Sequence, residues 1–248
     1  MRIGKQEQSA VNLIDKRQWV YTYTYLLSLA ILADAQVVAD KPLRCLVIGL
    51  GGGSFADFLA DQFPRMQVEV VEINPVIIRL AREYFPINAR IQIIAADARK
   101  FLRDTKKQYD VIVMDAFGEH AIPADLYTLE YFSLLKSRLA PTGLALMNSW
   151  ESRVLDAREL ATLAKVFPQG YYLSDPREYP GNRIYLMGNT LDSEETIRRR
   201  ISGVFMSRQF RGEDPVKILN GMQPLRAKAG VEPITDRNVR LILQQANY

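Results

Sequence analysis

The amino-acid sequence predicts an α/β protein with a mostly parallel sheet, and three observations lead to this prediction. Segments typical of strands alternate with segments typical of helices from Leu43 onward, which is the pattern of a parallel sheet covered on both faces. The first strand ends in Gly49-Leu50-Gly51-Gly52-Gly53 and the second ends in Glu72. A strand, a glycine turn, a helix and a strand that closes on a carboxylate are typical of an adenosine-binding βαβ unit.

Seven strands and five intervening helices are expected in order. Pro75 suits the first turn of a helix, because its missing N–H would be unpaired there in any case. Only eight residues, 175–182, separate the last two strands, which is too short for a helical crossover and predicts an antiparallel pair. The expected strands are 44–49, 68–73, 91–95, 110–115, 143–149, 170–174 and 183–188, and the helices 54–63, 75–84, 98–104, 128–139 and 152–167.

Seven strands with the last one antiparallel form the arrangement of the class I S-adenosylmethionine (SAM)-dependent methyltransferase fold, a Rossmann-like architecture. Residues 18–33 are expected to be partly helical, and further helices are expected at 192–210 and 234–246. We expect residues 1–40 to form a short N-terminal segment and residues 41–248 to form one methyltransferase-like catalytic domain with C-terminal helices.

Composition excludes several classes of function. The net charge is +4 and the basic residues are spread along the chain, so no nucleic-acid partner is expected. The longest apolar stretch, 25–32, is too short to cross a bilayer, and the first residues lack the apolar core of a secretory signal. The single cysteine, Cys45, is expected in the core. We expect a cytoplasmic protein without membrane partners and without a metal site.

The glycine turn distinguishes two classes of cofactor. A dinucleotide fingerprint has glycine at its first, third and sixth positions, but the sixth position counted from Gly49 is Ser54. Three consecutive glycines suit SAM or a relative, which has no pyrophosphate and lays a thioether chain against bare backbone. Glu72 lies at the spacing of roughly 20 residues at which a carboxylate accepts from the ribose hydroxyls. The turn therefore favours an adenosyl sulfonium over NAD.

Carboxylates also follow the third and fourth strands, at the edge of the sheet where ligands bind in open α/β folds. Asp97 is expected to accept from the adenine amino group, or to cap the helix that starts at Ala98, and its two oxygens permit both roles. Asp115 ends the fourth strand, where a carboxylate can stabilise a cation or act as a general base. The loop that follows contains Glu119 and His120, the only histidine of the chain.

These segments resemble the polyamine aminopropyltransferases, the spermidine synthase family. The resemblance rests on 49–53, 70–74, 96–98 and 109–115, with Pro123 and Leu126 after them, and spans roughly residues 8–148. It implies a transferase of polyamine biosynthesis that binds an adenosyl sulfonium, either decarboxylated SAM or SAM, and transfers an aminopropyl group to a small amine. We also expect a homodimer. It implies cofactor binding by Gln8, Gly49, Gly51, Gly52, Gly53, Glu72, Asp97 and Ala98, acid–base catalysis by Asp115, and substrate binding by Tyr21, Tyr23, Glu119 and His120.

Two departures from the family pattern keep other functions open. Ser54 stands where the family has an aspartate that selects decarboxylated SAM, and Gly118 stands where it has a diamine-binding aspartate, for which Glu119 can substitute. We also expect the N-terminal hairpin region to be shortened relative to the family. These departures predict weak transfer to putrescine. The alternatives are a SAM-dependent methyltransferase and a non-catalytic nucleoside-binding protein on the same scaffold.

Overall fold

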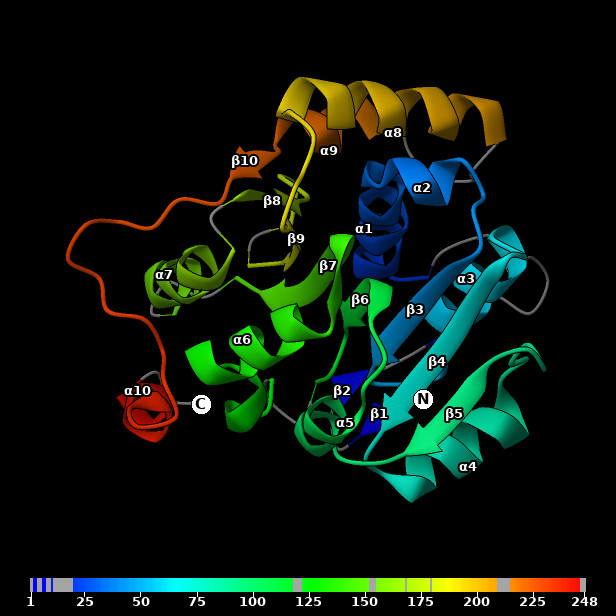
Figure 1. The fold of residues 1–248 in the computed structure, drawn as a ribbon, viewed down its shortest axis with the longest axis horizontal. Helices are drawn as coiled ribbons and strands as arrows, with labels where there is room; N and C mark the ends of the chain where they lie inside the picture. The colour runs from blue at the N-terminus through cyan, green and yellow to red at the C-terminus, as the bar shows by residue number, and fades with distance from the viewer. Residues whose placement is uncertain are drawn as a thin grey trace.

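The computed structural model describes residues 2–3, 6–7, 10, 20–117, 122–151, 155–167, 169–178, 180–208 and 215–245. Within them an eight-stranded sheet lies between two layers of helices (Figure 1), in the order β10-β8-β9-β7-β6-β3-β4-β5. Two short strands, β1 (Arg2–Ile3) and β2 (Gln6–Glu7), pair with each other in a separate antiparallel sheet. The α/β class predicted from the sequence is therefore confirmed.

Five strands of the main sheet run parallel to one another. They are β3 (Leu43–Ile48), β4 (Met66–Glu72), β5 (Gln92–Ala95), β6 (Tyr109–Met114) and β7 (Leu139–Trp150). Strand β9 (Asn182–Gly188) lies between β7 and β8 (Gln169–Ser174) and is antiparallel to both. The expected antiparallel last strand of the seven is thus confirmed, and its short link from β8 leaves no room for a crossover helix.

The main sheet has one strand more than the seven predicted. The extra strand, β10 (Gln223–Pro224), pairs antiparallel with Tyr171 and Tyr172 at the free edge of β8. Two residues carry no alternation of polar and apolar side chains, so the sequence gives no period-2 signal there. A proline, which lacks an N–H donor, is also compatible with a strand only at such an edge.

Helices cover both faces of the sheet, and each face has its own hydrophobic core. Cys45 and Val47 of β3 point into one core, whereas Leu46 and Ile48 point into the other, as the two-residue period of a strand requires. The first face carries α1 (Thr22–Ala30), α3 (Ser54–Gln62), α8 (Glu194–Arg208) and α9 (Pro215–Asn220). The second carries α5 (Ala98–Asp104), α6 (Leu129–Ser137), α7 (Asp156–Val166) and α10 (Val239–Gln245).

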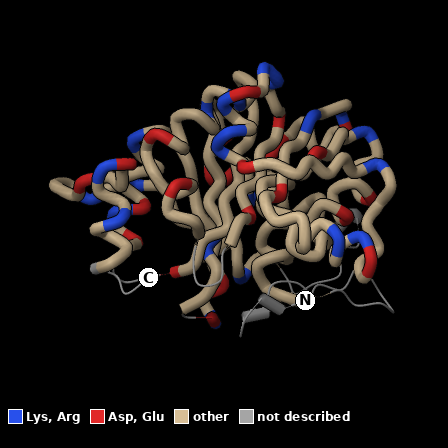
Figure 2. Tube along the Cα trace, turned by 90° about the horizontal axis from the view of Figure 1, so that it is seen from below, with Lys and Arg blue, Asp and Glu red and all other residues tan. Residues whose placement is uncertain are grey.

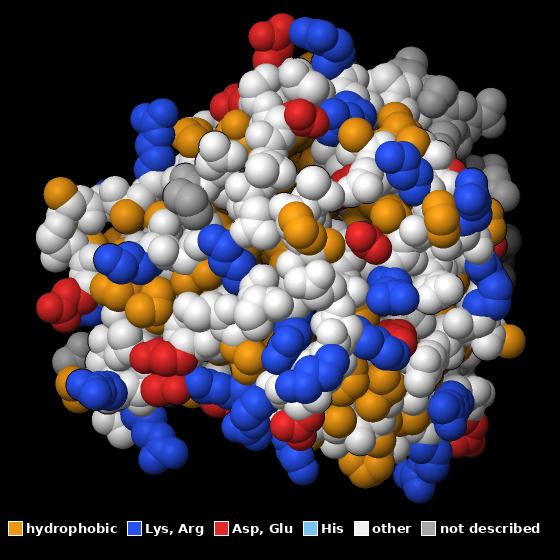
Figure 3. All heavy atoms as spheres, in the orientation of Figure 1, with side chains coloured by type: hydrophobic (Ala, Val, Ile, Leu, Met, Phe, Trp, Pro, Cys, Tyr) orange, Lys and Arg blue, Asp and Glu red, His pale blue; other side chains and the backbone are white. Residues whose placement is uncertain are grey.

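The remaining elements are η1 (Ile31–Ala33), α2 (Ala35–Val38), α4 (Pro75–Tyr84) and η2 (Ala124–Leu126). Beyond β10 the chain runs around the outside of α7 (Figure 1) and reaches α10, which packs against η2. Acidic and basic residues are interspersed along the trace (Figure 2), and on the face in Figure 3 basic side chains are scattered among apolar and uncharged ones. None of the helices in the described ranges is both long and apolar enough to cross a bilayer.

Candidate active site

A cleft of about 840 Å³ opens at the carboxyl ends of the parallel strands. This is the edge at which open α/β sheets bind ligands, because the connecting loops leave a crevice where the strand order reverses. The ends of β3, β4, β6 and β7 all contribute to its walls. Of the residues predicted for the site, those that line the cleft are Tyr21, Tyr23, Gly49, Gly51, Glu72, Asp97, Ala98 and Asp115.

The glycine turn brings the ends of β3 and β6 together. Gly49 has φ +95°, and a Cβ atom there would lie 2.3 Å from the carbonyl oxygen of Asp115. Gly52 and Gly53 do not line the cleft, although binding through them stays a prediction. A Cβ atom at Gly52 would collide with the ring of Phe85, and Gly53, at φ +74°, precedes the first turn of α3. The turn is therefore shaped as much by packing as by access to a ligand.

Glu72 is fixed in place before any ligand arrives. Its side chain is buried, and the backbone N–H of Leu50 donates to Oε2 at 3.0 Å while that of Asn74 donates to Oε1 at 2.8 Å. One donor belongs to the glycine turn and the other follows β4. Because a carboxylate has about four acceptor sites, each oxygen keeps capacity for a further donor such as a ribose hydroxyl.

Asp97 caps a helix and also lines the cleft. Its Oδ1 accepts from the backbone N–H of Lys100 at 2.7 Å and so caps α5. Asp97 also lines the cleft, together with Ala98 at the start of the helix. The cap uses one oxygen, so capping and contact with a ligand are compatible.

Asp115 lies directly after β6, and two asparagine side chains in series hold its carboxylate by hydrogen bonds. The side chain of Asn148 donates through Nδ2 to Asp115 Oδ1 at 2.8 Å, and Asn182 donates through Nδ2 to Asn148 Oδ1 at 2.9 Å. All three residues line the cleft. Burial raises the pKa of Asp115 to about 7, an effect that the hydrogen bond from Asn148 partly opposes. A carboxyl group with this pKa can exchange a proton near neutral pH.

A buried network of polar side chains lies next to Asn148, the residue that donates to Asp115. Ser149 donates to Oε1 of Glu159 at 2.5 Å, and Tyr185 donates to its Oε2 at 2.8 Å. Burial raises the pKa of Glu159, against the opposing effect of these hydrogen bonds. Arg183 is also buried and lies 3.2 Å from a carboxylate oxygen of Glu151. Ser149 itself lines the cleft, so the network fixes the position of one lining residue.

Another part of the cleft lining comes from the start of α1. The rings of Tyr21 and Tyr23 are stacked at 6.1 Å between centroids, and both residues line the cleft. Thr22 between them donates through Oγ1 to Glu178 Oε1 at 2.6 Å. Glu178 belongs to the β8–β9 connection, so this bond joins two segments of the cleft lining that are 156 residues apart in the sequence.

Several predicted residues lie outside the described residues, namely Gln8, Glu119 and His120. Sequence reasoning in turn missed cleft residues that the fold brings in. Asn148 and Trp150 end β7, and the rule that picked out Asp115 would have found them. Glu178, Asn182 and Leu243 come from a loop, an antiparallel strand and a late helix, for which that rule gives no signal.

The cleft carries negative charge only, as far as its described lining shows. Five carboxylates line it, whereas no lysine, arginine or histidine is found among the described lining residues. This contrasts with the net charge of +4 for the whole chain. A cleft lined by one sign of charge attracts ligands of the opposite sign. The carboxylates are those of Glu72, Asp97, Asp115, Asp125 and Glu178.

The strand order and the cleft at the strand ends define a protein of the class I methyltransferase fold. The profile of the spermine/spermidine synthase domain matches residues 30–196, about two thirds of the sequence. The chain therefore belongs to the spermine/spermidine synthase family.

One curated relative agrees with this assignment, and one solved structure agrees with the fold. The polyamine aminopropyltransferase of Vibrio vulnificus (strain CMCP6) is 34% identical over 168 residues, which are 64% of this chain and 55% of that protein. The chain thus spans little more than half the length of this relative. The crystal structure of a probable spermidine synthase from Corynebacterium glutamicum ATCC 13032 superposes with a TM-score of 0.71 at 24% identity, covering 89% of this chain and 82% of that one.

A methyltransferase shares the same architecture. Human methyltransferase-like protein 13, solved in complex with SAH, superposes with a TM-score of 0.67 at 24% identity, covering 80% of this chain and 97% of that one. Likeness at this level of identity concerns the fold, which hosts both kinds of transfer.

Proposed function

We propose that the protein transfers the aminopropyl group of decarboxylated SAM to a small amine. The observation that carries this proposal is that all charged side chains in the described cleft lining are acidic. Decarboxylated SAM carries a sulfonium and an ammonium group, and an amine acceptor is protonated in water, because the reference pKa of a primary amine is about 10. Every charged group in the reaction is then a cation that the five carboxylates can attract.

The same charge pattern favours decarboxylated SAM over SAM. SAM has a carboxylate beside its ammonium group, and a buried carboxylate needs a positive or hydrogen-bonding partner. The described lining offers acidic side chains instead. The selecting aspartate of the family is replaced by Ser54, the first residue of α3, so we assign the selection to the cleft as a whole.

The adenosyl end of the ligand is assigned to Glu72 and Asp97. Two backbone N–H groups already orient the Glu72 carboxylate, so ribose binding needs no rearrangement of that side chain. The capped Asp97 at the start of α5 is the acceptor proposed for the adenine amino group.

Asp115 is proposed as the general base. It takes a proton from the ammonium group of the acceptor, whose nitrogen then attacks the aminopropyl carbon bonded to sulfur. The new N–C bond forms as the C–S bond breaks, its electron pair stays on sulfur, and methylthioadenosine leaves as a neutral thioether. The proton passes from Asp115 to solvent. A base with a pKa of about 7 is suited to this task near neutral pH.

Glu178 is proposed to bind the acceptor at its far end. It lines the cleft, and Thr22 donates a hydrogen bond to one of its oxygens. Tyr21, Tyr23 and Trp150 line the same region and offer aromatic faces, which attract ammonium groups. Glu178 therefore supplies a carboxylate for a diamine in a chain whose Gly118 lacks one.

Methyl transfer is the second candidate, favoured by Ser54 in place of the selecting aspartate. The product separates the two reactions, because aminopropyl transfer releases methylthioadenosine whereas methyl transfer releases S-adenosylhomocysteine. Purified protein is incubated with either sulfonium and a series of monoamines and diamines, and the nucleoside products are identified by mass spectrometry. We expect methylthioadenosine from decarboxylated SAM, lost in Asp115→Asn. Release of S-adenosylhomocysteine alone would contradict the proposal.

A further inference from the structure

We infer that the C-terminal segment 226–245 forms part of the adenosyl end of the cleft, and that Arg99 is the residue that positions it there through Asp236. The segment lies outside the matched domain, which ends at residue 196. The inference rests on the proposed adenosyl site, and it adds to that site a lining residue from outside the matched domain, Leu243.

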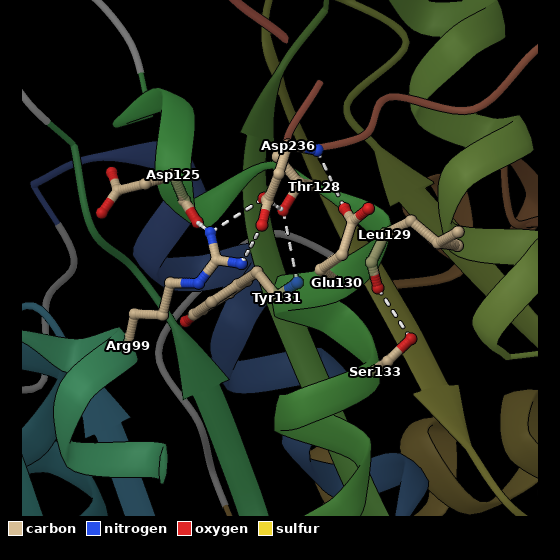
Figure 4. Close-up of polar contacts among 8 residues, drawn as sticks. All are labelled: Arg99, Asp125, Thr128, Leu129, Glu130, Tyr131, Ser133 and Asp236. Carbon is tan, nitrogen blue, oxygen red and sulfur yellow. Dashed lines mark hydrogen bonds and ion pairs between the residues drawn. The ribbon is translucent and has the colours of Figure 1, made fainter. Parts of the chain in front are cut away.

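Arg99 is the hub of the arrangement. It is the second residue of α5, directly after Asp97 and Ala98, which line the cleft. Its Nη1 donates to the backbone carbonyl of Asp125 at 3.0 Å and to Oδ1 of Asp236 at 2.9 Å, and its Nη2 donates to Oδ2 of Asp236. The guanidinium fork thus connects the start of α5 with η2 and with the C-terminal segment (Figure 4).

Asp236 is bound from the other side by the start of α6. Thr128, the N-cap of that helix, donates through Oγ1 to Asp236 Oδ1 at 2.6 Å, and the backbone N–H of Asp236 donates to Glu130 Oε2 at 2.9 Å (Figure 4). These partners fix both the carboxylate and the backbone. Arg99, and to a lesser degree Thr128, lowers the pKa of Asp236, so this carboxylate is ionised at neutral pH.

Ile234, two residues before Asp236, anchors the segment in the second core. Ile234 is fully buried, its N–H donates to Thr162 Oγ1 at 2.8 Å, and its carbonyl accepts from the N–H of Leu129 at 2.8 Å. Val239 and Ile242 of α10 are buried in the same core. The segment is therefore packed into the second core of the domain.

This docking brings α10 to the cleft. The helix packs against η2, and its Leu243 lines the cleft with Leu126 and Tyr127 of the adjacent turn. Arg99 holds η2 through the carbonyl of Asp125 and holds the segment through Asp236. Ala98, Leu126 and Leu243 are thus apolar cleft residues on the three segments that the Arg99 side chain connects.

Docking of the segment 226–245 is expected to be thermodynamically coupled to binding of a ligand at the adenosyl end of the cleft. If docked segment and bound ligand favour each other, the coupling is reciprocal: release of the segment weakens the ligand, and the ligand slows release of the segment. A tie that served stability alone would leave the ligand affinity of the folded protein unchanged, and the ligand would slow exchange in the segment only through global unfolding, as it does throughout the core.

The test uses the full chain and methylthioadenosine as the probe. Arg99→Leu removes the fork, and Asp236→Asn removes the charge but keeps the size and an acceptor for Thr128. Arg199→Leu is the matched control, because Arg199 pairs with Glu195 at 2.7 Å on the exposed surface of α8. Calorimetry gives the affinity, and amide hydrogen exchange follows residues 226–245 with and without the probe.

We expect the affinity to fall about fivefold or more in both site variants and to stay unchanged in the control. We also expect the probe to slow exchange of the backbone amides of Ile234 and Asp236 in the wild type. Wild-type affinity in folded Arg99→Leu and Asp236→Asn would overturn the inference while leaving the adenosyl site intact. Failure of the wild type to bind methylthioadenosine would overturn the proposed adenosyl site and the inference with it.

Discussion

The carbonyl oxygen of Asp115 occupies the space that a side chain at position 49 would need, since a Cβ atom there would lie 2.3 Å away. The ends of β3 and β6 are thus packed backbone to backbone, and Asp115 N–H donates to the carbonyl of Ile48 at 2.9 Å. The position of the proposed base is set by the absence of a side chain on the neighbouring strand.

Gly49→Ala is expected to destabilise the protein and to impair the site, because both the positive φ and the collision must be relieved by moving backbone. We expect a loss of about 1–3 kcal/mol in the free energy of unfolding, measured with urea, and a reduced rate of methylthioadenosine release. Gly230→Ala is the control: it shares a positive φ, +77°, but nothing lies within 4 Å of its Cβ position. Equal losses in both variants would show that φ alone matters.

Glu72→Ala is expected to weaken methylthioadenosine binding about tenfold or more, because hydrogen bonds to a charged acceptor contribute about 1.5–3 kcal/mol. Glu69→Ala changes the same strand away from the cleft, where Glu69 accepts from Tyr109, and is expected to leave the affinity unchanged. Calorimetry on folded variants decides. Unchanged affinity in Glu72→Ala would remove this residue from the ligand site.

The pH dependence of kcat/KM is expected to report Asp115. The base must be ionised to accept a proton, so kcat/KM should fall as the pH drops through about 7, the raised pKa of the free protein. Asn148 donates to the ionised form and lowers this pKa, so Asn148→Ala should move the acidic limb to higher pH. Asn189→Ala, a change outside the cleft lining, should not move it. A limb that stays in place in Asn148→Ala would argue against Asp115 as the titrating group.

Glu178→Gln is expected to raise KM for a diamine more than KM for a monoamine of similar length. Glutamine keeps an acceptor for Thr22 and removes only the charge, so the start of α1 stays joined to the β8–β9 connection. The loss of one charge-assisted contact corresponds to about tenfold or more in the diamine KM. Thr22→Val, which removes the tie but keeps the charge, is the companion variant. A uniform increase for both amines would assign Glu178 to structure alone.

Local signals in the sequence predicted those parts of the molecule that short segments determine. Helices α4 and α5 begin and end where expected, because Pro75 and the Asp97 cap mark their starts. Glu72 and Asp115 were found because parallel strands deliver their last residues to one edge. The other elements of the site depend on contacts between distant segments. Glu178 reaches the cleft through Thr22, and Leu243 through Arg99 and Asp236, and no local periodicity encodes such pairs.

The buried position of Cys45 provides a direct way to measure ligand binding. It is the only cysteine of the chain, its side chain has no exposed surface, and its strand is paired on both sides by β4 and β6. A thiol reagent reaches it only when the centre of the sheet opens, so the labelling rate under native conditions follows that opening. A ligand that binds only the folded cleft slows labelling by the factor 1 + [L]/Kd when opening is a rapid equilibrium. One native sulfur atom therefore reports the affinity of any ligand of the cleft without a turnover assay.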